Sequence, residues 1–93
     1  MYKIVRTKEF EKSLHKISRS GVSLSIRNSI TEVIKIISSG EVLDKRYKDH
    51  QLKGEFKNCR ECHIKTDLLL MYEVKNKELI LILVNIGSHS QLF

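Results

Sequence analysis

The sequence predicts an α+β fold, with an N-terminal strand, two helices and then a mostly antiparallel sheet of about four strands. Two observations support this fold class: apolar residues recur at helical spacing in the first half of the chain, and nearly continuous apolar runs follow in the second half. The chain has 93 residues, enough for one modest core, and it contains no proline, repeat or low-complexity segment that would mark a linker. We therefore expect a single domain over residues 1–93.

The first half of the chain predicts the strand and both helices. Tyr2–Arg6 is apolar at its centre and is expected to form a short strand. Thr7 can cap a first helix, whose apolar positions are Phe10, Leu14 and Ile17. Ser23 or Ser25 can cap a second helix, whose apolar stripe is formed by Ile26, Ile30, Val33, Ile34 and Ile37. Gly40 is suited to end that helix, because glycine accepts the left-handed conformation found there.

The second half predicts a loop followed by strands. Asp44–Leu52 is expected to be a polar, basic loop, and Glu55–Lys57 a short strand. Three further strands are expected at Arg60–Lys65, Leu68–Val74 and Leu79–Val84, with a polar turn between the last two. The last strand does not alternate, so both of its faces should be covered. Two helices can cover only one face, so the chain's own ends, a partner, or both must cover the other.

The composition favours an anionic partner. Seventeen Lys and Arg residues against eleven Asp and Glu residues give a formal net charge of +6, and the excess is concentrated between Lys45 and Lys65. Such a charge favours nucleic acid or an acidic protein. The N-terminus lacks the apolar core of a signal peptide, and no apolar run is long enough to cross a membrane. We therefore expect a cytoplasmic protein with reduced thiols.

Histidines beside an aspartate are the candidate catalytic groups. Imidazole exchanges protons near neutral pH, and His50, His63 and His89 all lie near basic residues or strand ends. A single histidine is more often a packing or surface residue, but this grouping favours acid–base chemistry on an anion. Asp67 follows a predicted turn and can orient an imidazole or accept a proton.

Alternation along the strand Arg60–Lys65 predicts which side chains share a face. Glu61, His63 and Lys65 should lie on the open face, and Cys62 and Ile64 on the face toward the helices. Cys59 and Cys62 have the spacing of half a zinc site, but no second pair exists and the two thiols should diverge on a strand. A basic zinc-binding module is therefore a distant alternative, and structural thiols are expected.

Three blocks of sequence resemble the YafQ-type branch of the RelE/ParE toxin superfamily: Tyr47–Gly54, Cys59–Leu70 and Gly87–Phe93. The resemblance extends over essentially the whole chain. It implies a RelE-like fold and a type II toxin that acts as a ribosome-dependent endoribonuclease on mRNA. It also implies silencing by an acidic DinJ-like antitoxin, and a toxin–antitoxin complex that binds operator DNA through the antitoxin. The positions that match the family's functional residues are His50, His63, Asp67, His89 and Phe93.

One position departs from the family pattern. Where relatives carry an arginine two residues before the glycine of the last block, this chain has Asn85. An arginine there is expected to bind the scissile phosphate, for which a charged, forked donor suits better than a neutral amide. We therefore expect weakened activity, with Asn85 close to His89 and Phe93. Arg60 or a loop lysine can compensate.

The sequence thus predicts an mRNA-cleaving nuclease. The RNA 2′-OH is the nucleophile, His50 and His63 transfer protons, Asp67 assists, and His89 is a third candidate for proton transfer. No cofactor, metal or membrane is required. The expected RNA contacts are Tyr47, Lys48, Lys53, Lys57, Arg60, Lys65, Asn85 and Phe93. The alternative is a ParE-like toxin that shares the fold but inhibits a protein target without enzymatic activity.

Overall fold

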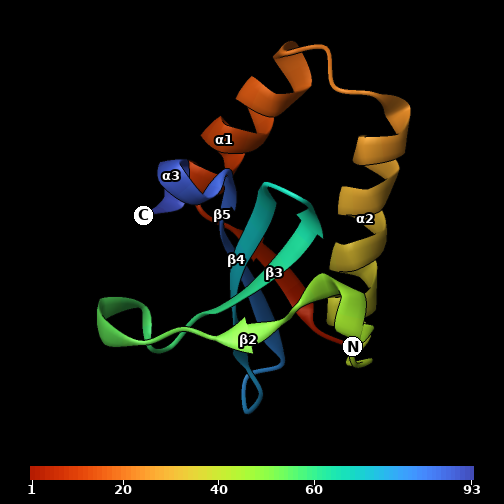
Figure 1. Cartoon of the computed structure of the whole chain (residues 1–93). Helices are drawn as coiled ribbons and strands as arrows, with labels where there is room; N and C mark the ends of the chain where they lie inside the picture. Colours follow the sequence, from red (N-terminus) through yellow and green to blue (C-terminus); the bar gives the residue numbers. More distant parts are fainter.

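The computed structural model describes all residues, 1–93, and has the predicted α+β architecture (Figure 1). Its helices and strands are β1 (Lys3–Arg6), α1 (Lys8–Arg19), α2 (Leu24–Ser38), β2 (His50–Gln51), β3 (Arg60–Lys65), β4 (Leu68–Lys75), β5 (Ile80–Gly87) and α3 (His89–Leu92). The sheet has five strands in the order β1-β5-β4-β3-β2. All neighbouring strands are antiparallel except β1 and β5, which are parallel. None of the helices has the length and apolar character needed to span a bilayer.

The two long helices begin and end where local signals place them. The Thr7 hydroxyl accepts a hydrogen bond from the Phe10 N–H at 3.0 Å and so caps α1. Ser23, rather than Ser25, caps α2 in the same way. Gly40 follows the end of α2 with φ +85°, the left-handed conformation that ends helices and that glycine adopts without strain.

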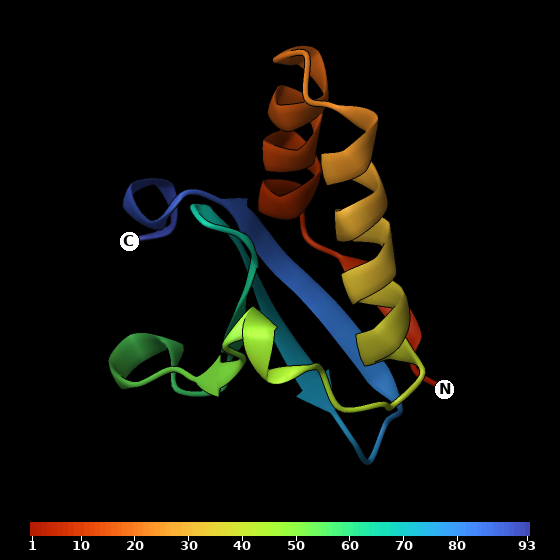
Figure 2. The same ribbon diagram turned by 45° about the vertical axis from the view of Figure 1, so that its right-hand side comes forward.

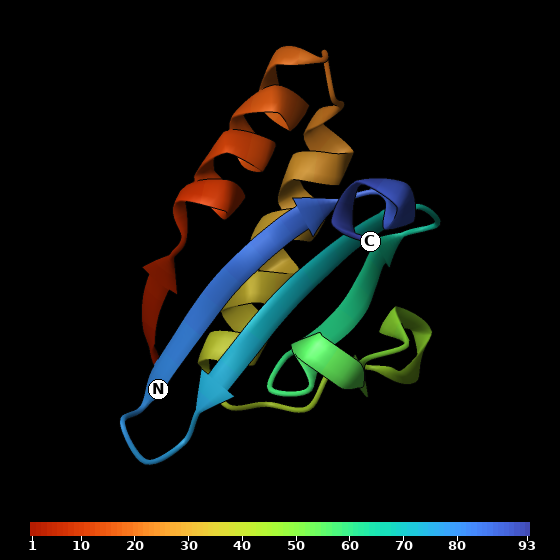
Figure 3. The ribbon, with the colours of Figure 1, turned by 90° about the vertical axis from the view of Figure 1, so that its left-hand side faces the viewer.

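The two faces of the sheet are covered by different elements (Figures 2 and 3). Helices α1 and α2 pack on one face, which we call the helix face, and bury a cluster of thirteen residues that includes Phe10, Val33, Cys62 and Leu81. The opposite face, which we call the open face, has a smaller buried cluster formed by Cys59, Leu69, Met71 and Leu92. Leu92 belongs to α3, so the C-terminal end of the chain covers part of this face. This agrees with the prediction that the chain's own ends, a partner, or both cover the second face of the last strand.

Two local predictions are wrong. Glu55–Lys57 is not a strand: Gly54–Phe56 forms a 3-10 helix, entered through a positive φ of 70° at Gly54. Backbone hydrogen bonds from Lys57 to Gly54 and from Cys59 to Phe56 close consecutive tight turns, and a strand cannot form there. The predicted loop Asp44–Leu52 contains a 3-10 helix, Lys45–Tyr47, and the short strand β2. The strand that precedes β3 in the sheet is therefore β2, and not the predicted Glu55–Lys57.

Candidate active site

Two imidazoles and one carboxylate meet on the open face at the β2–β3 pair. The register places His50 opposite Glu61, and His63 follows on the same face of β3. The Nε2 atoms of His50 and His63 lie 3.6 Å and 3.8 Å from Glu61 Oε1. The Glu61 side chain is only 5% exposed, while the His50 and His63 side chains are 49% and 31% exposed. We call these three residues the His–Glu–His cluster.

The backbone at Lys48 fixes the orientation of His50. Lys48 adopts a left-handed conformation with φ 50°, which is uncommon for a residue other than glycine. Its carbonyl oxygen accepts a hydrogen bond from His50 Nδ1 at 2.8 Å. This assigns the proton to Nδ1 in the neutral ring, so Nε2 is the atom that faces Glu61 and can exchange a proton.

Glu61 has an unusual position for a carboxylate. Its second oxygen, Oε2, is buried and has no hydrogen-bond partner. Burying an unpaired anionic oxygen costs free energy and is rare in native structures, so it calls for an explanation. Sequence reasoning placed Glu61 on the same face as His63 but gave it no role. Alternation along β3 predicts that Glu61 shares a face with His63. Only the pairing of β2 with β3 shows that Glu61 also faces His50.

A second polar network holds the β2 segment against the sheet. The Arg60 guanidinium donates two hydrogen bonds to Asp49 Oδ2, at 3.2 Å and 2.9 Å, and the Tyr72 hydroxyl donates to Asp49 Oδ1. Hydrogen bonding to Asp49 raises the pKa of Arg60. Burial, with Asp49 beside it, raises the pKa of Tyr72. The guanidinium of Arg60, a predicted RNA contact, is bonded to Asp49, the neighbour of His50, and so helps to position that segment.

The remaining predicted catalytic residues gather at α3. Asp67 Oδ1 accepts a hydrogen bond from the backbone N–H of His89 at 3.2 Å. Asp67 therefore fixes the start of α3, which Ser88 and Gln91 also cap. The His89 and Phe93 ring centroids lie 5.0 Å apart, and Phe93 packs edge-to-face on another ring of the open face, Phe56.

The predicted RNA contacts differ in how accessible they are. Lys48, Lys53, Lys57 and Lys65 are exposed and form no salt bridge, and Phe93 is half exposed. Tyr47, in contrast, is buried in the larger core, where its ring cannot stack on a base.

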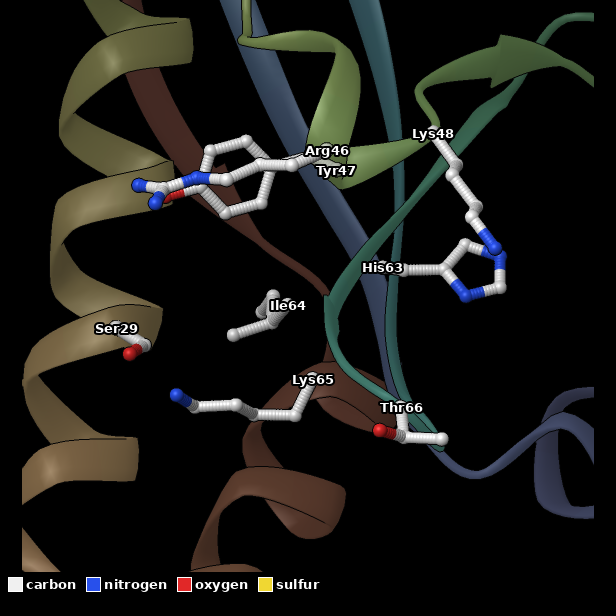
Figure 4. Close-up of a pocket in the computed structure, with 8 residues that line it drawn as sticks. All are labelled: Ser29, Arg46, Tyr47, Lys48, His63, Ile64, Lys65 and Thr66. Carbon is white, nitrogen blue, oxygen red and sulfur yellow. The ribbon is translucent and has the colours of Figure 1, made fainter.

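Lys65 departs from the predicted alternation. The register between β3 and β4 shifts between His63 and Lys65, so the alternation breaks there. Lys65 extends toward α2, whereas His63 points the opposite way (Figure 4).

Asn85 is held by the first helix. Its Oδ1 accepts hydrogen bonds from Ser13 Oγ of α1 at 2.7 Å and from the backbone N–H of Ile86 at 2.8 Å. We expected this side chain to lie beside His89 and Phe93, but the structure fixes its oxygen against α1. No local sequence pattern predicts this contact, because Ser13 lies far from Asn85 along the chain.

The two cysteines are separated by the sheet. Cys62 lies in the core of the helix face and Cys59 in the cluster of the open face, as the predicted strand geometry requires. Burial raises the pKa of Cys59, and raises the pKa of Cys62 to about 12, so both thiols stay protonated at neutral pH. No group of three or more His, Cys, Asp or Glu side chains is arranged to hold a metal ion.

Solved structures resemble this chain along its full length. A copper-bound mutant toxin from Helicobacter pylori is 44% identical, with a TM-score of 0.87 and coverage of 100% of both chains. The Escherichia coli DinJ–YafQ complex contains a chain that is 23% identical, with a TM-score of 0.85 and coverage of 100% of this chain and 99% of that one. At this lower identity the similarity establishes the fold.

Sequence comparisons identify the family. A YafQ toxin of Haemophilus influenzae is 31% identical over 71 residues, which is 76% of this chain and 70% of the relative. The mRNA interferase toxin YafQ of Escherichia coli K12 is 38% identical over 47 residues, 50% of this chain and 49% of the relative. The family model described as "Bacterial toxin of type II toxin-antitoxin system, YafQ" matches residues 2–93. The chain therefore belongs to the YafQ family of type II toxin–antitoxin toxins.

Proposed function

We propose that this protein is an endoribonuclease that cuts mRNA on the ribosome. The observation that supports this function is the His–Glu–His cluster, in which two imidazole Nε2 atoms face one carboxylate oxygen on an exposed, basic surface. The Escherichia coli relative is named an mRNA interferase toxin, which supports the same activity for this chain. RNA carries its own nucleophile, so proton transfer and charge stabilisation are the chemistry that the protein must supply.

The proposed reaction transfers the phosphate to the 2′-oxygen. One imidazole of the cluster removes the 2′-OH proton while the O2′–P bond forms. The other imidazole protonates the 5′-oxygen while the P–O5′ bond breaks, which leaves a 2′,3′-cyclic phosphate and a free 5′-OH. Glu61 stabilises whichever imidazole is positively charged at each stage, since its Oε1 lies within 4 Å of both. Buried and fixed in the sheet, this carboxylate does not need to reorganise during the reaction.

The second group of residues, at α3, completes the proposed site. His89 is a third candidate for proton transfer, and Asp67 holds the helix that carries it. The half-exposed ring of Phe93 offers a face for a base to stack on. Lys48, Lys53 and Lys57 are free of ion pairs and bind the RNA backbone.

Asn85 weakens this activity in our proposal. The resemblance to the YafQ branch implies an arginine where this chain has Asn85, and a neutral amide lacks the charge needed to stabilise the phosphate in the transition state. The Asn85 oxygen is also engaged by Ser13, so little of this side chain is left to face the RNA.

An acidic antitoxin of the DinJ type is the proposed protein partner. The Escherichia coli YafQ has been solved in complex with DinJ, and the net charge of +6 on this chain favours an acidic partner. The antitoxin covers the same basic surface that binds RNA and so blocks cleavage. We further propose that the complex binds operator DNA through the antitoxin.

Primer extension on a message translated in the presence of the purified protein tests this function. Discrete cuts within codons, with fragments that end in a 2′,3′-cyclic or 3′-phosphate, are the expected result. An intact message in a translation reaction that nevertheless stops would favour the ParE-like alternative, in which the same fold inhibits a protein target. Addition of the co-expressed antitoxin should suppress the cuts.

A further inference from the structure

The loop between β2 and β3 contacts α3 through a pair of aromatic rings. Phe56 lies at the end of the 3-10 helix in this loop, and its ring centroid is 5.7 Å from that of Phe93, with an angle of 87° between the ring planes. This edge-to-face geometry is a favourable one for two aromatic rings. The loop and α3 project on the same side of the sheet, away from α1 and α2 (Figure 2). No backbone hydrogen bond joins the two segments, so side-chain packing holds them together.

Phe56 is the better anchored of the two rings. The side-chain amide of Gln51 donates hydrogen bonds to the backbone carbonyls of Lys57 and Cys59, which closes the base of the loop. The Phe56 ring is half-buried and packs against the buried cluster of the open face. Phe93, in contrast, is half exposed and lies at the C-terminal end of α3, a single helical turn that is marginally stable by itself. Phe56 is therefore the fixed ring, and Phe93 is the ring that it restrains.

The imidazole of His89 depends on Phe93 for its position. The His50 ring is oriented by the hydrogen bond from its Nδ1 to the Lys48 carbonyl. The ring of His89 has no such bond and no salt bridge: only the backbone N–H of this residue is bonded, to Asp67. The neighbour of the ring is Phe93, whose centroid lies 5.0 Å away. His89 is thus placed by an aromatic contact, where His50 is placed by a polar one.

The register of the sheet places α3 close to the His–Glu–His cluster. His63 pairs with Leu69, and Leu69 pairs with Gly87, so these residues form one row across β3, β4 and β5. Neighbouring strands lie about 4.8 Å apart, which puts Gly87 roughly 10 Å from His63. His89 follows Gly87 almost directly in the chain. An RNA strand bound at the cluster can therefore also contact the ring of His89.

We propose that Phe56 is a positioning residue of the nuclease, which holds Phe93 in place and, through Phe93, the imidazole of His89. The proposal rests on the proposed function, since it takes His89 and Phe93 as parts of the site. A group that transfers a proton must lie within hydrogen-bond reach of the reacting atom, so an exposed imidazole that is free to rotate is a poor catalyst. Phe56 acts through the two rings and makes no bond to the RNA itself.

The NMR resonances of the His89 ring test this positioning without any cleavage. The ring current of Phe93 shifts the imidazole protons of His89, and Phe93→Ala shows where these resonances lie without it. Phe56→Ala should move the His89 resonances toward their positions in Phe93→Ala. Phe56→Tyr keeps the aromatic ring and should leave them near their parental positions. Leu52→Ala is the matched control, because Leu52 packs against the same open-face cluster from the same loop but makes no aromatic contact.

Cleavage kinetics measure the consequence for the reaction. Phe56→Ala should slow single-turnover cleavage of ribosome-bound mRNA roughly two- to tenfold, the range that corresponds to the loss of one aromatic pair. Phe56→Tyr and Leu52→Ala should cleave at about the parental rate. Because Phe56 acts through Phe93, the double variant Phe56→Ala/Phe93→Ala should cut no more slowly than Phe93→Ala alone.

Unchanged His89 resonances in the folded Phe56→Ala variant would overturn the proposal. Losses of cleavage that add fully in the double variant would overturn it as well, since Phe56 would then act independently of Phe93. These outcomes are separate from failure of the proposed function, which is judged by whether the parent cuts mRNA, because the NMR comparison needs no activity. Circular dichroism of each variant establishes that the fold is retained.

Discussion

The two faces of the sheet bury different kinds of side chain: the helix face holds the larger apolar core that stabilises the fold, and the open face holds the candidate active site. The helix face buries thirteen residues of mainly aliphatic and aromatic character beneath α1 and α2. The open face buries only four in its own cluster and also encloses Glu61, a carboxylate with one unpaired oxygen. The same strands β3 and β4 supply both faces. Their alternation lets a strand contribute Cys62 to the core and its neighbours Glu61 and His63 to the site.

The largest expected effect is on cleavage, from removal of either imidazole on the open face. His50→Ala and His63→Ala should each slow single-turnover cleavage of ribosome-bound mRNA by roughly 10²–10⁴-fold, the range for loss of a general acid or base. Both side chains are substantially exposed, so the midpoint of thermal unfolding should change little. His15→Ala is the matched control, since His15 is an exposed histidine of α1. If both variants cleave less than about threefold more slowly than the parent, neither imidazole takes part in proton transfer.

The helix face should show the opposite pattern. Leu81 is fully buried there, and Leu81→Ala should lower the free energy of unfolding by about 2–5 kcal/mol through lost burial and the cavity that remains. Urea denaturation measures this change. Phe93→Ala on the open face is the comparison, and because half of that side chain is exposed we expect a loss below about 1.5 kcal/mol. Equal losses at the two positions would contradict the division between the faces.

Asn85→Arg should strengthen the open-face chemistry. A guanidinium can donate charged hydrogen bonds to the scissile phosphate, worth about 1.5–3 kcal/mol, so the cleavage rate should rise roughly ten- to a hundredfold. The substitution also removes the Ser13–Asn85 hydrogen bond, which Ser13→Ala removes without adding a cation. An unchanged rate in the folded Asn85→Arg variant would mean that another cation already serves the phosphate, or that the side chain at this position stays directed at α1, as Asn85 is.

The helix face should also respond to alkaline pH. Burial raises the pKa of Cys62 from 9.0 to about 12, so above pH 9 the unfolded chain loses a proton that the native state keeps. The contribution of this thiol to the free energy of unfolding is therefore complete below pH 9. It should fall as the pH rises toward 12, by up to about 1.4 kcal/mol per pH unit. Cys62→Ala should show a shallower decline between pH 9 and 11. Urea midpoints at each pH measure the two slopes, and parallel slopes would exclude this thiol as the cause.

Local signals made most of the fold predictable. Thr7 and Ser23 cap the helices, Gly40 follows the second one, and β3 has the predicted bounds, because each depends on residues close together in the sequence. Sequence also separated the two thiols correctly, through simple alternation.

Contacts between distant segments were not predictable. Arg60 is occupied by Asp49 only because β2 pairs with β3, and Asn85 is held only because α1 packs beside β5. Lys65 turns toward α2 because the β3–β4 register shifts after His63. The 3-10 helix at Gly54–Phe56 depends on a positive φ that the sequence permits but does not require. The importance of Glu61 emerged only when the pairing placed His50 beside it.

Glu61→Gln tests the central claim most directly, that the open face keeps a buried charge for catalysis. The amide keeps the shape of the side chain but removes the anion that faces both imidazoles. Single-turnover cleavage should fall roughly five- to thirtyfold, because about 1–2 kcal/mol of electrostatic stabilisation is lost. The free energy of unfolding at pH 8, where free imidazole is neutral, should stay equal or rise by about 1 kcal/mol, because an unpaired buried charge has been removed. Unimpaired cleavage together with a less stable protein would contradict the account, since Glu61 would then be a structural residue.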